Sequence, residues 1–254
     1  MTQGEILRLD VDDIDLSAAL IPGRKRPLHG GHGDLHSADA LLVSRSVPVV
    51  AVADGPERNP AASSSFLKKF DDALAASSIR FAGRPIAQSF AAVTGLVNTL
   101  VRTVGYHDST TFSAFIPVTD GSTPLGIVLH TGDSLILRIE QLTGVVTQIS
   151  RTSHVVVGRA TALFQTEIIP FGTGDLIVLA SDGVTDLART RGVVPAALLS
   201  AGAPVSGCRS VVQYIVDSAG ETSVRLDDIT IVCAAVGPLS VAGGGPSASR
   251  IILT

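Results

Sequence analysis

The sequence predicts an α+β fold in which helices and sheets are segregated along the chain. Short apolar runs of strand length gather in groups, and pairs of helical patterns separate the groups. The expected order is strands, two long helices, strands, two helices and one final strand. Because parallel βαβ units need strands and helices in alternation, this order favours antiparallel sheets instead.

The composition narrows the class of protein. The 254 residues are 45% hydrophobic, enough to bury the core of one large domain or two small ones. A net charge of −4 argues against a nucleic-acid binder, which normally carries a basic face. The N-terminus lacks the features of a signal peptide and no apolar run has membrane-spanning length, so we expect a soluble, cytoplasmic protein without membrane or nucleic-acid partners. Cys208 and Cys233 stand in apolar settings, which favours reduced, buried thiols.

The first part of the chain is predicted to contribute a lead-in, a loop and two strands. Residues 1–27 form the lead-in, with one edge strand at residues 6–11. A loop rich in Gly and His follows at residues 28–36. Two short strands joined by a turn are then expected at residues 40–44 and 47–53.

Two helices are expected next. Phe66, Phe70 and Leu74 recur on one face of residues 61–77. Residues 85–104 carry the clearest helical period of the chain, with a proline in the first turn and a glycine after the end. Their apolar stripe advances in steps of three and four residues and consists of Ile86, Phe90, Val93, Val97, Leu100 and Val104.

The second half of the chain changes to a strand pattern. Short β segments separated by Gly, Asp, Ser and Thr turns are expected at residues 110–118, 124–131, 134–140, 144–149, 166–170 and 176–180. Helices are expected around residues 194–200 and 206–218, followed by a last strand at residues 229–236. The predicted main domain therefore spans residues 28–237, and residues 238–254 are expected to form a flexible Gly/Ser-rich tail.

Short acidic motifs at the ends of apolar runs carry the functional information. They are Asp54-Gly55, Asp182-Gly183 and Asp227-Asp228. Carboxylates at the ends of buried strands are costly unless a cation is shared among them. Oxygen ligands without Cys or His in ligand spacing favour Mg²⁺ or Mn²⁺ over Zn²⁺. A carboxylate that bridges two such ions is typical of sites that hydrolyse phosphate esters.

The motifs and their order resemble those of the metal-dependent Ser/Thr protein phosphatases of the PPM family (protein phosphatase 2C-like), in particular the minimal bacterial type. The resemblance runs from about residue 33 to residue 236. It rests on Ser37-Ala38-Asp39-Ala40, Val52-Ala53-Asp54-Gly55, Asp108-Ser109-Thr110-Thr111, His130-Thr131-Gly132-Asp133-Ser134, Leu179-Ala180-Ser181-Asp182-Gly183 and Asp227-Asp228-Ile229-Thr230. The last of these resembles a family motif that reads Asp-Asn-Ile-Thr.

The resemblance implies a fold, a site and a substrate class. The fold would be a four-layer α-β-β-α sandwich of two antiparallel sheets flanked by helices. Two Mn²⁺ or Mg²⁺ ions would be held by metal ligands and catalytic carboxylates, namely Asp54, the Gly55 carbonyl, Asp182 and Asp227. Asp39 would orient water beside the ions, and Asp133 stands where some members hold a third metal. The substrate would be a phosphorylated protein, such as a kinase or another signalling regulator.

The chain departs from the family pattern around the phosphate. The Arg that usually precedes the opening motif is replaced by Asp34, and the acid before Asp39 is replaced by Ala38. Arg58 and His36 are the candidate phosphate contacts in its place, although solvated loop positions would explain both better. These departures leave an alternative to the phosphatase, a phosphatase-like regulatory or binding module with weak or no turnover. A second alternative is an unrelated α+β protein whose aspartates only make turns.

Overall fold

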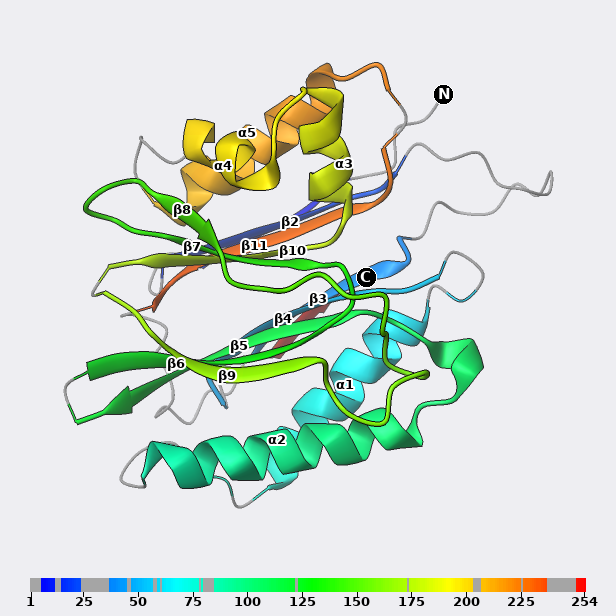
Figure 1. Ribbon diagram of the computed structural model, residues 1–254. Coiled ribbons are helices and arrows are strands. Elements are labelled where there is room, and N and C mark those ends of the chain that lie inside the picture. The colour runs from blue at the N-terminus through cyan, green and yellow to red at the C-terminus, as the bar shows by residue number, and fades with distance from the viewer. Residues whose placement is uncertain are drawn as a thin grey trace.

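Two sheets and the helices outside them arrange the chain in four layers (Figure 1). The computed structural model describes residues 6–11, 15–23, 37–44, 47–56, 59, 61–77, 79, 85–121, 123–172, 174–202, 207–224, 226–236 and 250–254. Within them, two six-stranded antiparallel sheets face each other, with helices on the outer face of each. This architecture confirms the predicted α-β-β-α sandwich.

The strands fall into two sheets whose orders interleave distant parts of the sequence. The first sheet, called sheet A, has the order β1 (Leu7–Val11), β2 (Leu16–Ile21), β11 (Ile229–Ala235), β10 (Leu176–Ala180), β7 (Leu135–Ile139) and β8 (Val146–Gln148). The second, called sheet B, has the order β12 (Arg250–Leu253), β3 (Asp39–Ser44), β4 (Val49–Asp54), β5 (Phe112–Asp120), β6 (Thr123–Thr131) and β9 (Gln165–Pro170). Since β6 lies in sheet B and β7 in sheet A, the chain crosses between the sheets at residues 132–134.

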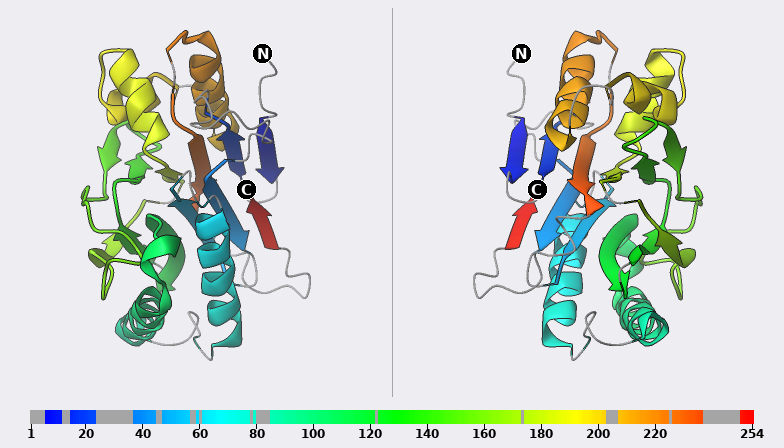
Figure 2. Two further views of the ribbon diagram at one scale, coloured as in Figure 1. Left: turned by 90° about the vertical axis from the view of Figure 1, so that its right-hand side faces the viewer. Right: turned by 90° about the vertical axis from the view of Figure 1, so that its left-hand side faces the viewer.

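The helices divide between the two outer faces. Sheet B is covered by α1 (Ala61–Ala76) and α2 (Ile86–Thr103), and sheet A by α3 (Gly183–Thr190), α4 (Pro195–Gly202) and α5 (Cys208–Glu221) (Figure 1). Figure 2 shows the molecule turned by 90°, with β1 (blue) and β12 (red) on the same side. No helix of the described residues is long and apolar enough to span a bilayer.

Each interface between layers has its own apolar core. Val52, Phe115 and Ile177 belong to the core between the sheets. Phe66 and Phe70 of α1 contact the ring of Phe112 edge-on, with centroids 5.1 and 5.0 Å apart, in the core beneath sheet B. Because the central strands are covered on both faces, β11 is buried at every position, and its sequence reads as one apolar run rather than an alternating one.

The structure adds three elements that the sequence did not indicate. The strand β2 lies inside the region expected to be a lead-in, buried between β11 and β1, and β1 is the edge strand expected at residues 6–11. The helix α3 begins directly after Asp182. The strand β12 pairs with β3 within the segment expected to be a flexible tail, where the apolar Ile252 and Leu253 pack against the cores. The Gly/Ser-rich stretch before it lies outside the described residues.

Candidate metal centre

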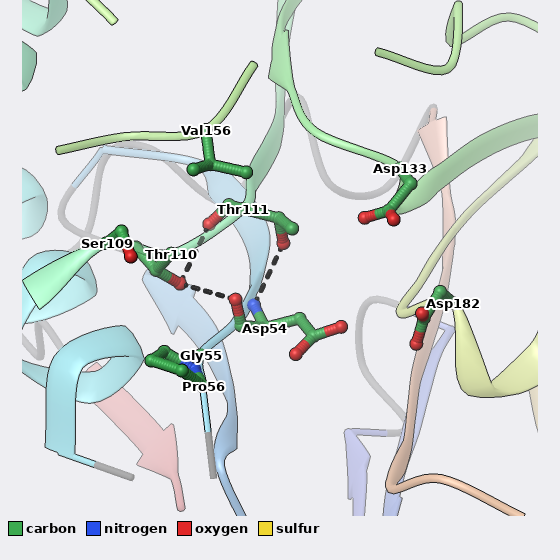
Figure 3. A pocket seen from close by; sticks show the side chains of 9 residues that line it. All are labelled: Asp54, Gly55, Pro56, Ser109, Thr110, Thr111, Asp133, Val156 and Asp182. Carbon is green, nitrogen blue, oxygen red and sulfur yellow. Dashed lines mark hydrogen bonds between the residues drawn. The ribbon is translucent and has the colours of Figure 1, made fainter. Parts of the chain in front are cut away.

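Three of the predicted acidic residues line one open pocket at the ends of the strands. The pocket is lined by Asp54, Gly55, Pro56, Ser109, Thr110, Thr111, Asp133, Val156 and Asp182. Figure 3 shows the carboxylates of Asp54, Asp133 and Asp182 pointing into the same space. Each comes from a different place in the fold: Asp54 ends β4 of sheet B, Asp182 follows β10 of sheet A, and Asp133 lies on the crossover between the sheets. The topology thus brings together carboxylates that are far apart in the sequence.

Asp39 lies buried beside Asp54 at this site. They stand opposite each other in the β3–β4 register, and Asp39 is 2% exposed. Burial raises the pKa of Asp39 to about 8. Burial, together with the charges of Asp39 and Asp182, raises the pKa of Asp54 to about 10. A positive charge placed beside these two carboxyls would therefore strongly favour their ionised forms.

Asp182 marks the sheet A side. It precedes α3, yet its side chain makes no capping hydrogen bond to that helix, which leaves the carboxylate directed at the pocket. Burial, followed by the charges of Asp133 and Asp227, raises its pKa to about 6. The charge of Asp227 also raises the pKa of Asp54, so Asp227, just before β11, lies within electrostatic reach of both.

Two threonines hold the backbone of Asp54 in place. The Asp54 carbonyl accepts hydrogen bonds from the Thr111 N–H and from Thr110 Oγ1, both at 2.8 Å. The Asp54 N–H donates to Thr111 Oγ1 at 3.0 Å, and this hydroxyl also shares a hydrogen bond of 2.7 Å with Ser134 Oγ. Ser134 is the neighbour of Asp133. A continuous hydrogen-bonded path therefore connects the backbone of Asp54 with the crossover that carries Asp133.

The donor set fits a hard divalent cation. Asp39 Oδ2 is buried, and no hydrogen-bond donor reaches it in the described part of the chain. No basic side chain of the described residues lines the pocket. The available donors are carboxylate and carbonyl oxygens, which suit Mg²⁺ and Mn²⁺. No three acidic, His or Cys side chains of the described residues converge closely enough to enclose an ion by themselves.

The remaining predicted residues divide into two groups. The candidate phosphate contacts Arg58 and His36 lie outside the described residues. His130 is buried and bonded to Ser113 and to the carbonyl of Arg151. Cys208 and Cys233 are buried free thiols, as the sequence indicated.

Sequence reasoning missed the residues that support the carboxylates. Thr110, Thr111 and Ser134 stood within recognised motifs but had no assigned role, because only the fold shows which backbone group each hydroxyl reaches. Asp228 likewise stood in a motif without a role, although its side chain bonds to residues of two other segments. In the sequence, these residues could have been recognised only as Ser, Thr or Asp positions close to an acidic residue of a motif.

Comparison with known proteins identifies the family. The sequence model described as stage II sporulation protein E (SpoIIE) matches residues 70–237. No curated protein matches the chain significantly.

Solved structures agree on the fold. The S. agalactiae serine/threonine phosphatase is 16% identical with a TM-score of 0.63, covering 91% of this chain and 98% of its own. The catalytic domain of the phosphatase PstP in complex with two manganese ions is 17% identical with a TM-score of 0.59, covering 91% and 99%. RsbX in complex with magnesium is 12% identical with a TM-score of 0.58, covering 91% and 99%. Since the family match extends over more than half of the chain, the protein belongs to the SpoIIE family of PPM-type, protein phosphatase 2C-like proteins.

Proposed function

We propose that the protein is a Mn²⁺- or Mg²⁺-dependent phosphatase that removes phosphate from serine or threonine of a protein substrate. The observation that carries the proposal is the convergence of Asp54, Asp133 and Asp182 on one open pocket, with the buried Asp39 opposite Asp54 in the β3–β4 register. Similar folds holding manganese in PstP and magnesium in RsbX support the choice of metal.

The chain's residues divide the work of holding the ions. Asp54, the Gly55 carbonyl, Asp182 and Asp227 would hold two ions, and Asp133 would hold a third, more peripheral one. When bound, the ions would balance the charge of the phosphoryl oxygens and lower the pKa of a water molecule, so that it could lose a proton and attack phosphorus as hydroxide.

Asp39 would act beside the ions rather than on the substrate. Its Oδ2 is buried without a donor, so it is available to accept a hydrogen bond from a water molecule and to fix that water's orientation. The hydrogen bonds from Thr110 and Thr111 hold the backbone of Asp54 in place, so that its carboxylate would stay directed at the ions.

The form of the pocket supports a protein substrate. It is open to solvent, and its lining includes Pro56, Ser109 and Val156, so a phosphorylated side chain could enter while its backbone stays outside. We therefore infer a phosphorylated protein of a signalling pathway, such as a kinase or another regulator, as the partner. Arg58 and His36 stay predicted phosphate contacts.

A regulatory module with weak or no turnover is the second candidate. It is favoured by the absence of any basic side chain from the described lining of the pocket, because phosphate would then depend on the ions alone.

One experiment separates the two candidates. Mn²⁺ is titrated into the protein by calorimetry, and a phosphothreonine peptide is then assayed at saturating Mn²⁺, with Asp182→Asn as the control. Binding with turnover that Asp182→Asn removes is the expected result. Binding without turnover would leave the regulatory module, and turnover independent of metal and of Asp182 would overturn both.

A further inference from the structure

The side chain of Asp228 joins three segments at the end of the sandwich that holds the pocket. Its Oδ1 accepts the N–H of Gly23 at 2.5 Å. Its Oδ2 accepts Ser37 Oγ at 3.0 Å and the N–H of Ala38 at 2.8 Å. Asp228 immediately precedes β11 and Gly23 follows β2, both in sheet A, whereas Ser37 and Ala38 lead into β3 of sheet B. The carboxylate therefore connects the two sheets.

The chain is shaped to allow this close approach. A Cβ on Gly23 would lie 2.9 Å from Asp228 Oδ1 and 2.8 Å from the Asp228 nitrogen. A Cβ on Gly183, at the start of α3, would lie only 2.1 Å from the carbonyl oxygen of Asp228. Both glycines thus leave the space that Asp228 occupies.

The contacts continue from Asp228 to the candidate metal ligands. The carbonyl of Ala38, whose N–H is bound by Asp228, accepts the N–H of Gly55 at 3.1 Å and Ser63 Oγ. Ser37 Oγ, which donates to Asp228, also accepts the N–H of Asp39 at 3.1 Å. Hydrogen bonds through one intervening residue therefore link Asp228 to both sites: Ala38 links it to Gly55, and Ser37 links it to Asp39.

We propose that Asp228 is a positioning residue that sets where Asp39 and Gly55 stand relative to Asp182 and Asp227. The inference rests on the proposed function, since it concerns the same metal centre. Removing the carboxylate would take away the hydrogen bonds by which Asp228 ties Ser37 and Ala38 of the sheet B part to the sheet A part of the centre. The ligands would then sample a wider range of separations, which weakens a site that needs them at fixed distances.

The chemistry of the side chain accounts for an acid at this position. The resembling motif carries Asn, which has one acceptor oxygen and one NH₂ donor. Here the donors from Gly23 on one side and Ala38 on the other each face a different oxygen. An Asn could satisfy one of them only by turning its NH₂ group toward the other, so Asp228→Asn breaks the connection with almost no change of shape.

The test compares three variants without added metal and with Mn²⁺. Asp228→Asn removes the connection, Ser37→Ala removes one donor without changing charge, and Asp120→Asn is a matched control at the exposed hairpin end of β5. Amide exchange at Gly23 and Ala38 is measured by NMR in the metal-free protein, and Mn²⁺ affinity by calorimetry at low and high salt.

We expect Asp228→Asn to speed exchange at Gly23 or Ala38 by about tenfold or more, and to weaken Mn²⁺ binding by about tenfold at both salt concentrations. Ser37→Ala should change both quantities less, in the same direction, and Asp120→Asn should change neither. A loss of affinity that high salt abolishes would reveal an effect of charge and overturn the proposal.

Other outcomes are equally decisive. Unchanged Mn²⁺ affinity in Asp228→Asn, with faster exchange, would reduce Asp228 to a structural role, and unchanged exchange would refute the connection itself. If Asp228→Asn does not fold, unchanged affinity in Ser37→Ala overturns the inference. A wild-type protein that binds Mn²⁺ without turnover would contradict the proposed function while the affinity test stays decisive, whereas a wild type that binds no Mn²⁺ would overturn both.

Discussion

The two sheets contribute unequal halves to the candidate metal centre. On the sheet B side, Asp39 and Asp54 are opposed in one register, and both the N–H and the carbonyl of Asp54 are hydrogen-bonded to Thr110 or Thr111. On the sheet A side, Asp182 is half-buried like Asp54, but its side chain makes no capping bond. The burial that raises the pKa of Asp54 to about 10 raises that of Asp182 only to about 6. We infer that the sheet B half is rigid and lowers the stability of the metal-free protein, because its carboxyls are the harder ones to ionise. The sheet A half is held by fewer hydrogen bonds and completes the site.

The largest expected effect follows from changing the rigid half. Asp54→Asn should reduce Mn²⁺-dependent turnover by at least about a hundredfold, because a shared ligand is lost. The same variant should stabilise the metal-free protein by about 2 kcal/mol at pH 7. Folding raises the pKa of Asp54, so the folded state holds a proton that the unfolded state has released, and stability falls as the pH rises from the unfolded value of about 4 toward 10.

Thermal unfolding with and without Mn²⁺ checks this prediction, with Asp182→Asn as the matched change in the other half. Asp182→Asn should lower turnover comparably but stabilise the metal-free protein less. Equal stabilisation by the two variants would contradict the division of the site into unequal halves.

The next effect concerns the support of Asp54. Thr111→Val keeps the shape of the side chain but removes the hydroxyl that binds the Asp54 N–H and Ser134. We expect a loss of about 1–3 kcal/mol of stability and a turnover lowered about tenfold at saturating Mn²⁺. Denaturant unfolding and steady-state kinetics measure the two losses. Ser134→Ala, which leaves the Asp54 N–H bonded, should cost less in both; a larger cost would show that Thr111 serves mainly the crossover.

These supports also show how far the sequence alone could reach. The apolar runs of β4, β10 and β11 predicted buried strands, and the aspartates at their ends predicted where the site would assemble. By contrast, β2 has small and apolar residues on both faces, so no alternation marked it, and β12 is recognisable only through its pairing with β3. Hydrogen bonds between distant segments, such as those from Thr111 to Asp54, depend on strand register, which the sequence does not express locally.

A smaller effect is expected at the crossover between the halves. Asp133→Ala should lower turnover about threefold to tenfold, well below the effect of Asp54→Asn, because Asp133 is predicted to serve a peripheral metal only. Its loss should be recovered at higher Mn²⁺ concentration, which a titration of turnover against Mn²⁺ would show. Equal damage from Asp133→Ala and Asp54→Asn would remove the distinction between core and peripheral ligands.

The smallest effect on turnover, and a clear one on stability, is expected at His130 behind the rigid half. Burial lowers the pKa of His130 to about 4, and its ring nitrogens bond to Ser113 and to the carbonyl of Arg151. The unfolded chain therefore takes up a proton below about pH 6.5 that the folded protein refuses, so stability is lost as the pH falls from about 6.5 to about 4, by up to about 3 kcal/mol. Denaturant unfolding of wild type and His130→Gln across this range, in metal-free buffer, measures the difference.

His130→Gln should lose less stability on acidification than the wild type. Asp39 and Asp54 add stability as the pH falls, which opposes the loss from His130. Because both proteins keep these carboxyls, the difference between wild type and His130→Gln reports the histidine alone. Parallel pH profiles for the two proteins would show that His130 is protonated in the folded protein as well.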